Sequence, residues 1–251
     1  MKNLVNYLGI LILSVTILSC TNDKKTATEN KVAEVVNQSP VKSILTAEEQ
    51  ANMSPDEIIG RLKKGNENFV SNNLTQRDHS SQRREAMIGQ YPKAIVLSCV
   101  DSRVPVEDVF DLGIGDIFVA RVAGNIENAD IVGSMEFATA VAGSKIVIVM
   151  GHTSCGAVKH AIDNTDAASM EMNSLQNLLN EIKPSIAITE KNGEVSSKNV
   201  PFTNSVITNN AIKTVEDIRK ASPKMAALEK EGKIKIVAAV YNMSSGKVEF
   251  K

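Results

Sequence analysis

Three uninterrupted runs of apolar residues constrain the fold of this chain most strongly. They span residues 94–99 (AIVLSC), 117–122 (IFVARV) and 146–150 (IVIVM), and each is followed by a turn or a helical segment. Strands that read as continuous apolar runs are typically buried on both faces, as in parallel sheets covered by helices. The pattern therefore predicts an α/β fold with a mostly parallel central sheet flanked by helices.

Two further segments complete the predicted sheet. A fourth apolar run covers residues 234–241 and follows a predicted helix at 212–220. Residues 247–250 come directly after the turn Ser244-Ser245-Gly246, which favours a hairpin. We therefore expect about four parallel strands and one edge strand.

Helical segments are predicted on both sides of the first strand. Thr46 and Ser54 are N-cap residues followed by acids, and Pro55 occupies the first helical position. Four more helices are predicted, at 81–89, 133–141, 156–162 and 172–182. The rest of 163–210 is polar, is predicted as loop, and has no role that the sequence indicates.

The first twenty residues form a separate segment. Lys2 precedes an apolar run, Leu4 to Leu18, that is too short for a comfortable membrane span and fits a secretory signal. The run ends at Ser19-Cys20, which resembles a bacterial lipobox. The resemblance implies cleavage before Cys20 and a lipid anchor on it. An ordinary signal peptide and an uncleaved anchor are the alternatives.

The expected domain organisation follows from this start. Residues 1–19 are the predicted lipoprotein signal peptide, 20–43 the lipidated cysteine and a flexible polar tether, and 44–251 the catalytic domain. The expected location is the cell envelope, on the periplasmic side. Because Thr21 rather than an aspartate follows the cysteine, the outer membrane is preferred if the cell has one.

The overall charge excludes one class of partner. The chain carries 28 Lys and Arg against 29 Asp and Glu, a net charge of −1, and it has no tryptophan. Such a chain has no basic field to attract nucleic acid and few aromatic rings on which bases could stack. We expect no nucleic-acid partner.

Chemically reactive residues follow the ends of two predicted strands. The first strand ends in Cys99-Val-Asp101-Ser-Arg103, and the third is followed by His152-Thr-Ser-Cys155. Because carboxyl ends of parallel strands meet at one edge of a sheet, these side chains should converge there. Two thiolates and one imidazole suit Zn²⁺, and three protein ligands would leave its fourth position open, as in catalytic zinc sites. On an extended chain, residues 99, 101 and 103 would share one side.

Each of these residues also has an ordinary interpretation. Cys99 alone could be a small buried hydrophobe, and His152 a hydrogen-bonded histidine beside a glycine. In an exported protein, Cys99 and Cys155 could instead form a disulfide. The joint pattern favours the metal site, because both pieces end strands and a carboxylate and a guanidinium lie nearby.

Together these motifs resemble the β-class carbonic anhydrases, in the plant-like subgroup. The resemblance rests on C-x-D-S-R at 99–103 and H-x-x-C at 152–155, and it extends over roughly residues 62–250. Supporting agreements are Lys63-Lys-Gly-Asn66-x-x-Phe69, Phe118-Val-x-Arg121, Gly133-Ser-x-Glu136 and Gly246-Lys-Val. The fold implied is a parallel-centred sheet with N-terminal helices that dimerise, giving a homodimer or homotetramer.

The resemblance also implies roles for individual residues. Cys99, His152 and Cys155 would bind Zn²⁺, while Asp101 and Arg103 would form the dyad that orients a zinc-bound hydroxide. Asp101 could become a fourth zinc ligand in an inactive state, if Arg103 swings away.

The substrate pocket implied by the family uses four further positions. Gln90 would orient substrate across a dimer interface, and Phe118 would form an apolar wall. Phe137 stands where many members have tyrosine, so any hydroxyl contribution is lost there. The N–H of Gly156 would point toward the substrate.

The implied function is the reversible hydration of carbon dioxide to bicarbonate and a proton. Two alternatives share the same residues: a hydrolase of carbon disulfide or carbonyl sulfide, and a non-catalytic zinc- or bicarbonate-binding module. An intact pair of Asp101 and Arg103 argues against the second, because a structural zinc does not need it.

Overall fold

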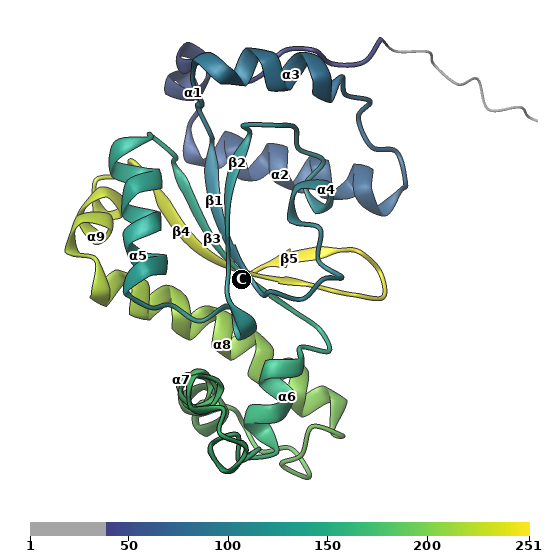
Figure 1. Ribbon diagram of the computed structural model, residues 1–251, viewed down its shortest axis with the longest axis vertical. Helices are drawn as coiled ribbons and strands as arrows, with labels where there is room; N and C mark the ends of the chain where they lie inside the picture. Colours follow the sequence, from purple (N-terminus) through teal and green to yellow (C-terminus); the bar gives the residue numbers. More distant parts are fainter. Residues whose placement is uncertain (1–38) are drawn as a thin grey trace, which may run out of the picture. The chain divides into compact units, whose positions relative to one another are not determined.

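The computed structural model describes residues 39–251 (Figure 1). The predicted signal peptide, Cys20 and most of the predicted tether lie outside the described residues. Within residues 39–251, no helix is both long enough and apolar enough to cross a membrane.

A five-stranded sheet in the order β2-β1-β3-β4-β5 forms the centre of the fold (Figure 1). The strands are β1 (Ala94–Ser98), β2 (Ile117–Arg121), β3 (Ile146–His152), β4 (Lys235–Tyr241) and β5 (Val248–Phe250). The first four are parallel, and β5 pairs antiparallel with β4. The predicted sheet of four parallel strands and one edge strand is therefore confirmed.

Helices cover both faces of this sheet and one of its ends. They are α1 (Ala47–Asn52), α2 (Pro55–Val70), α3 (His79–Glu85), α4 (Val106–Val109), α5 (Ala129–Glu136), α6 (Gly156–Ile162), α7 (Asn173–Ile188), α8 (Val200–Ala221) and α9 (Pro223–Lys230). In Figure 1, α6 and α7 lie beyond the ends of the strands.

Alternate residues of the central strands divide the core into two layers. Val96 and Ile148 join one apolar cluster with residues of α2 and α4. Ile95 and Val147 join the cluster on the opposite face, with residues of α5, α8 and α9. Because side chains alternate along a strand, a continuous Val/Ile run supplies both layers at once.

Strand β3 runs two residues beyond its predicted end at Met150. His152 pairs in register with Tyr241 of β4, so it is the last residue of the strand. Gly151 makes this possible, because a Cβ there would lie 3.2 Å from Ile207 Cγ2 of α8. The sheet itself thus fixes the backbone of His152.

Two predicted helices have different boundaries in the structure. The helix predicted at 133–141 begins at Ala129, capped by Asn128, and passes into a π-helix at Phe137–Val141. The helix predicted at 81–89 is α3, capped by Asp78, followed by a 3₁₀ turn at Ala86–Ile88. In both cases an Asx side chain that accepts a backbone N–H starts the helix.

The polar loop predicted in the second half of 163–210 is present but is confined to residues 189–199. Helix α7 continues past Pro184 to Ile188, and α8 begins at Val200, twelve residues before the predicted start of the helix at 212–220. The buried face of α8 includes Thr203, Asn210 and Thr214. These polar residues interrupt the apolar periodicity by which an amphipathic helix is recognised.

A buried carboxylate ties the N-terminal segment to the turn after α4. The Asp111 side chain is 3% exposed and accepts hydrogen bonds from Arg77 Nη1 (2.7 Å), Asn68 Nδ2 (2.8 Å) and the Thr75 N–H (2.9 Å). Burial by itself would raise the pKa of Asp111, but these hydrogen bonds outweigh burial and lower it. Asp111 therefore stays ionised and holds the segment in place.

Replacing Asp111 with asparagine should lower the free energy of unfolding at neutral pH by about 1.5 to 3 kcal/mol, the usual contribution of hydrogen bonds to a charged group. The folded-state pKa lies below the unfolded value of about 3.9, so the carboxylate stabilises the fold above that pH. The contribution is lost as pH falls through the folded-state pKa. Urea unfolding of both proteins should show a difference at neutral pH that narrows in acid; a constant difference would contradict this.

Candidate metal centre

Three metal-ligating side chains converge where β1 and β3 end and α6 begins. The ligand atoms of Cys99, His152 and Cys155 all lie within 4.8 Å of one another. The three residues are 4%, 1% and 1% exposed, respectively. Cys99 directly follows β1, His152 ends β3, and Cys155 is the N-cap of α6, so the sheet and one helix fix the cluster.

The donor atoms of this cluster fit a zinc ion. His152 Nδ1 donates to Thr153 O at 3.0 Å, which leaves a lone pair on Nε2. That Nε2 is buried and has no hydrogen-bond partner within the described residues. A buried, unsatisfied nitrogen facing two thiols is the arrangement that a metal ligand requires.

The two cysteines lie close enough together for each to shift the pKa of the other. Both are free thiols, so they are not joined by the alternative disulfide. A hydrogen bond from the Cys155 thiol lowers the pKa of Cys99 to about 4. The same hydrogen bond, together with burial, raises the pKa of Cys155. A divalent cation would displace protons from these thiols and bind both sulfurs as thiolates.

A carboxylate and a guanidinium pair beside this cluster. Arg103 Nε donates to Asp101 Oδ1 (2.9 Å) and Nη2 donates to Oδ2 (2.7 Å), a bidentate pair. Asp101 Oδ2 lies 3.8 Å from His152 Nε2, so the carboxylate faces the metal ligands. Hydrogen bonds from Arg103 lower the pKa of Asp101 to about 2, which keeps this carboxyl group ionised.

The expected extended backbone through 99–103 is wrong. The chain turns after Asp101: the Arg103 N–H donates to Asp101 Oδ1 (3.0 Å), and the Val104 N–H donates to Asp101 O (3.2 Å). Asp101 thus forms an Asx turn that brings Arg103 back onto its carboxylate. A turn, rather than strand alternation, assembles the pair.

Arg121, at the end of β2, anchors the same turn. Its Nη1 donates to Cys99 O (3.0 Å), and its Nη2 donates to Val104 O (2.6 Å). One guanidinium therefore bridges the two ends of the segment that carries Asp101 and Arg103. The sequence assigned Arg121 no role beyond motif agreement, although a charged residue within an otherwise apolar run was the available signal.

The four predicted substrate-pocket residues are not gathered at the metal ligands of this chain. Phe118 and Phe137 have ring centroids 6.1 Å apart and line a cleft of 770 Å³ between β2 and α5 that contains no metal ligand. Gly156 adjoins the centre as the first residue of α6. Gln90 is exposed before β1, at the opposite end of the strand from Cys99.

Comparison with known proteins agrees with this geometry. Residues 94–248 match the family model for carbonic anhydrase. A carbonic anhydrase of Mycolicibacterium smegmatis is 31% identical over 203 residues, which cover 80% of this chain and 95% of that protein.

Solved structures show the same fold. The β-carbonic anhydrase CcaA is similar with a TM-score of 0.59 and 20% identity, over 78% of this chain and 93% of that one. A structure reported among two tetrameric β-carbonic anhydrases from Sordaria macrospora aligns with a TM-score of 0.52 and 18% identity, over 78% and 91% of the two chains. This chain therefore belongs to the carbonic anhydrase family, and its fold is that of the β class.

Proposed function

We propose that this protein is a zinc-dependent carbonic anhydrase that interconverts carbon dioxide with bicarbonate and a proton. The observation that carries the proposal is the ionised Asp101, held by Arg103 and directed at a cluster of three metal ligands. A purely structural zinc site would be closed by a fourth ligand and would not need an oriented carboxylate. Membership of the carbonic anhydrase family supports the same conclusion.

The residues of this chain divide the chemistry among them. Cys99, His152 and Cys155 would hold Zn²⁺, which when bound supplies the Lewis acidity that makes water nucleophilic near neutral pH. Asp101 would accept a hydrogen bond from the nucleophilic water and orient that water toward the substrate carbon. With a pKa of about 2, Asp101 is a weak base that orients water rather than storing its proton. Arg103 keeps it charged and in position.

Stopped-flow hydration of carbon dioxide, with zinc quantified in the same sample, tests the proposal on the chain from Thr21 onward. We expect near-stoichiometric zinc and hydration within the range from about pH 6.5 to about pH 9, with a rate that rises with pH, because two thiolates make zinc a weaker Lewis acid than the three imidazoles that give bound water a pKa of about 7. Bound zinc without hydration would overturn it. If that sample instead turned over carbon disulfide or carbonyl sulfide, the protein would be a hydrolase of those compounds. If it turned over none of the three substrates, it would be a non-catalytic zinc- or bicarbonate-binding module.

Arg121 provides a prediction on the geometry of the centre. Replacing Arg121 with methionine removes its hydrogen bonds to Cys99 O and Val104 O and frees the turn that carries Asp101. We expect the hydration rate to fall by about 10-fold or more, the usual cost of losing a residue that supports metal ligands. Steady-state kinetics on samples of known zinc content measure this. A hydration rate in the variant equal to that of the wild type would show that the turn keeps its position without Arg121.

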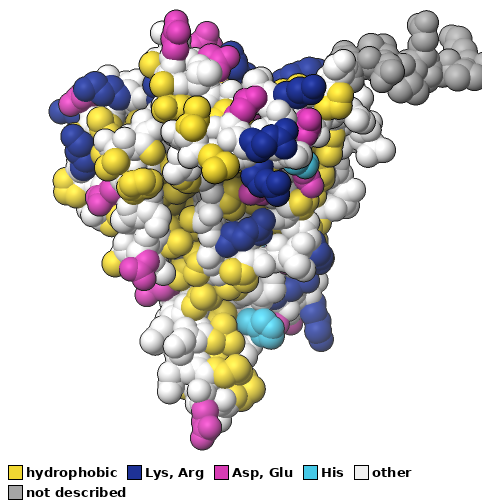
Figure 2. Space-filling view, turned by 45° about the horizontal axis from the view of Figure 1, so that its top comes forward, with side chains coloured by type: hydrophobic (Ala, Val, Ile, Leu, Met, Phe, Trp, Pro, Cys, Tyr) yellow, Lys and Arg dark blue, Asp and Glu magenta, His cyan; other side chains and the backbone are white. Residues whose placement is uncertain are grey.

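We also propose that the functional form is a dimer formed across the edge strand β2. Among residues 39–251, strand β2 has no strand neighbour on one side, and its apolar residues are only partly buried. Ile88 is 93% exposed and Phe137 is 50% exposed. Figure 2 shows hydrophobic side chains gathered in a band on one face.

The dimer would also complete the site. Strand β1 separates Gln90 from Cys99 by about 16 Å along the sheet, farther than a glutamine side chain reaches. Only a second copy could therefore bring its Gln90 to this metal centre. The substrate roles of Phe118, Phe137 and Gly156 belong to the same proposal.

Sedimentation of an Ile88→Glu variant tests the interface. We expect a monomer with reduced hydration, because a charge would be buried at the contact and the partner glutamine withdrawn. Ile188→Glu, on α7, is the control, since Ile188 is also exposed, at 66%. A dimeric Ile88→Glu protein would place the interface elsewhere.

For the N-terminus we propose a lipid anchor on Cys20 and a place on the periplasmic face of the envelope, with the outer membrane preferred. The support is the basic start, the apolar run 4–18 and the Ser19-Cys20 junction. Labelling cells with a fatty-acid analogue should mark the protein and fail to mark a Cys20→Ala variant. Equal labelling of the wild type and the Cys20→Ala variant would show that Cys20 does not carry the lipid.

A further inference from the structure

The metal ligand Cys99 is contacted by the backbone turn that follows β2. The N–H of Gly124 donates to Cys99 Sγ over 3.3 Å. Gly124 has a φ of +72°, and a Cβ there would lie 2.7 Å from Ile182 Cδ1 of α7. The turn is thus pressed against α7 while its N–H faces the sulfur, and only glycine fits both conditions.

Helix α8 holds the same residue from the other side. Asn210 Nδ2 donates to Gly124 O over 2.8 Å, and Ser185 Oγ of α7 donates to Asn210 Oδ1 over 3.1 Å. Asn210 is 2% exposed and Ser185 is 0% exposed. A chain of hydrogen bonds therefore runs from Ser185 through Asn210 and Gly124 to the sulfur of Cys99.

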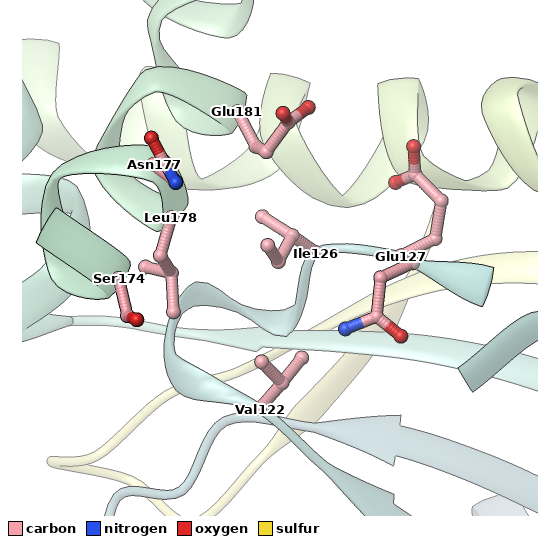
Figure 3. A pocket seen from close by; sticks show the side chains of 8 residues that line it. Val122, Ile126, Glu127, Ser174, Asn177, Leu178 and Glu181 are labelled. Atoms are coloured by element: carbon pink, nitrogen blue, oxygen red, sulfur yellow. The ribbon is translucent and has the colours of Figure 1, made fainter. Parts of the chain in front are cut away.

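Apolar packing alone does not fix this turn. A cleft of 480 Å³ lies between the segment after β2 and α7 (Figure 3). Val122, Ile126 and Leu178 line its apolar part, and Glu127 and Glu181 border it. Val122 and Ile126, on either side of Gly124, border this cleft, so the directional hydrogen bond from Asn210 adds a polar contact to the packing of Gly124 against Ile182.

We propose that Asn210 is a positioning residue for the metal centre: through Gly124 it holds a hydrogen bond on the Cys99 thiolate. This gives a role to the 163–210 region, which places Ser185 and Asn210 behind the turn. The inference rests on metal ligation by Cys99, not on the substrate. A hydrogen bond to a ligating thiolate withdraws electron density from sulfur and orients it, which tunes the metal.

Replacing Zn²⁺ with Co²⁺ in the full chain makes this contact visible, because thiolate-to-cobalt charge transfer reports the electron density on sulfur. In Asn210→Leu the absorption band should move to longer wavelength, since the thiolate loses its hydrogen bond. Ser185→Ala should give a smaller shift in the same direction. Zinc affinity, measured by chelator competition, should fall about 10-fold in Asn210→Leu, the lower end of the cost of losing an outer-shell partner.

Asn209→Ala is the matched control. Asn209 neighbours Asn210 on α8 and donates to Oγ1 of Thr189, the C-cap residue of α7, at 2.8 Å, so the variant removes a hydrogen bond of α8 without removing the one to Gly124. The proposal would be overturned if Asn210→Leu showed the same cobalt absorption band and the same zinc affinity as Asn209→Ala. If Asn210→Leu does not fold, the position of the same absorption band in Ser185→Ala and in the isosteric Asn210→Asp tests the proposal instead. A shifted band in a protein without hydratase activity would leave this inference standing while removing the proposed function.

Discussion

Replacing Cys155 with serine is expected to remove zinc and hydration together. Cys155 is 1% exposed and its sulfur lies within 4.8 Å of the ligand atoms of Cys99 and His152, so its loss leaves the cluster with two of its three ligand atoms. A serine hydroxyl stays protonated at neutral pH and is a poor ligand for Zn²⁺. We expect hydration to fall by more than the roughly 10- to 100-fold that loss of a supporting residue costs.

Metal analysis and stopped-flow rates on the same preparation measure this effect. His160→Ala is the control, because His160 lies on the same helix and is exposed, and its side chain bonds only to Thr165 Oγ1 among the described residues. It should retain zinc and activity. Near-stoichiometric zinc in Cys155→Ser would show that Cys155 is not a ligand.

Replacing Asp101 with asparagine should have the opposite combination of effects: zinc retained and hydration lost. The amide has nearly the same shape, but it carries no charge and can present a donor where the water needs an acceptor. We expect the rate to fall by about 10²- to 10⁴-fold, the range for groups that handle protons in catalysis. The ligands Cys99, His152 and Cys155 are unchanged, so the metal content should stay near that of the wild type.

The pH dependence sharpens this prediction. The pKa of Asp101 is lowered to about 2 by Arg103, so the carboxyl group is ionised throughout the neutral range. The deficit of Asp101→Asn should therefore be the same across that range, and any acid limb of the wild-type profile should belong to another group. Asp108→Asn, in the exposed first turn of α4, is the control. A deficit that disappears toward acid pH would show that Asp101 titrates there.

The sequence by itself determined the parallel sheet and the ligand cluster. Continuous Val/Ile runs can be buried only in a sheet covered on both faces, and parallel strands bring their carboxyl ends to one edge. Cys99 and His152 were therefore expected at one edge of the sheet. The structure supplied the strand order, which makes β1 and β3 neighbours and brings the two side chains together.

Other parts of the site depend on contacts that no local pattern records. Asp101 and Arg103 are two residues apart, yet an Asx turn rather than an extended strand brings them together. Asn210 lies 86 residues after Gly124, on a helix whose buried polar residues hide its periodicity. From sequence alone, a polar side chain on a helix is interpreted as facing solvent, because its buried hydrogen-bond partner is not known. Only the tertiary structure, by packing α7 and α8 behind the turn, decided that this asparagine faces a carbonyl group next to the metal centre.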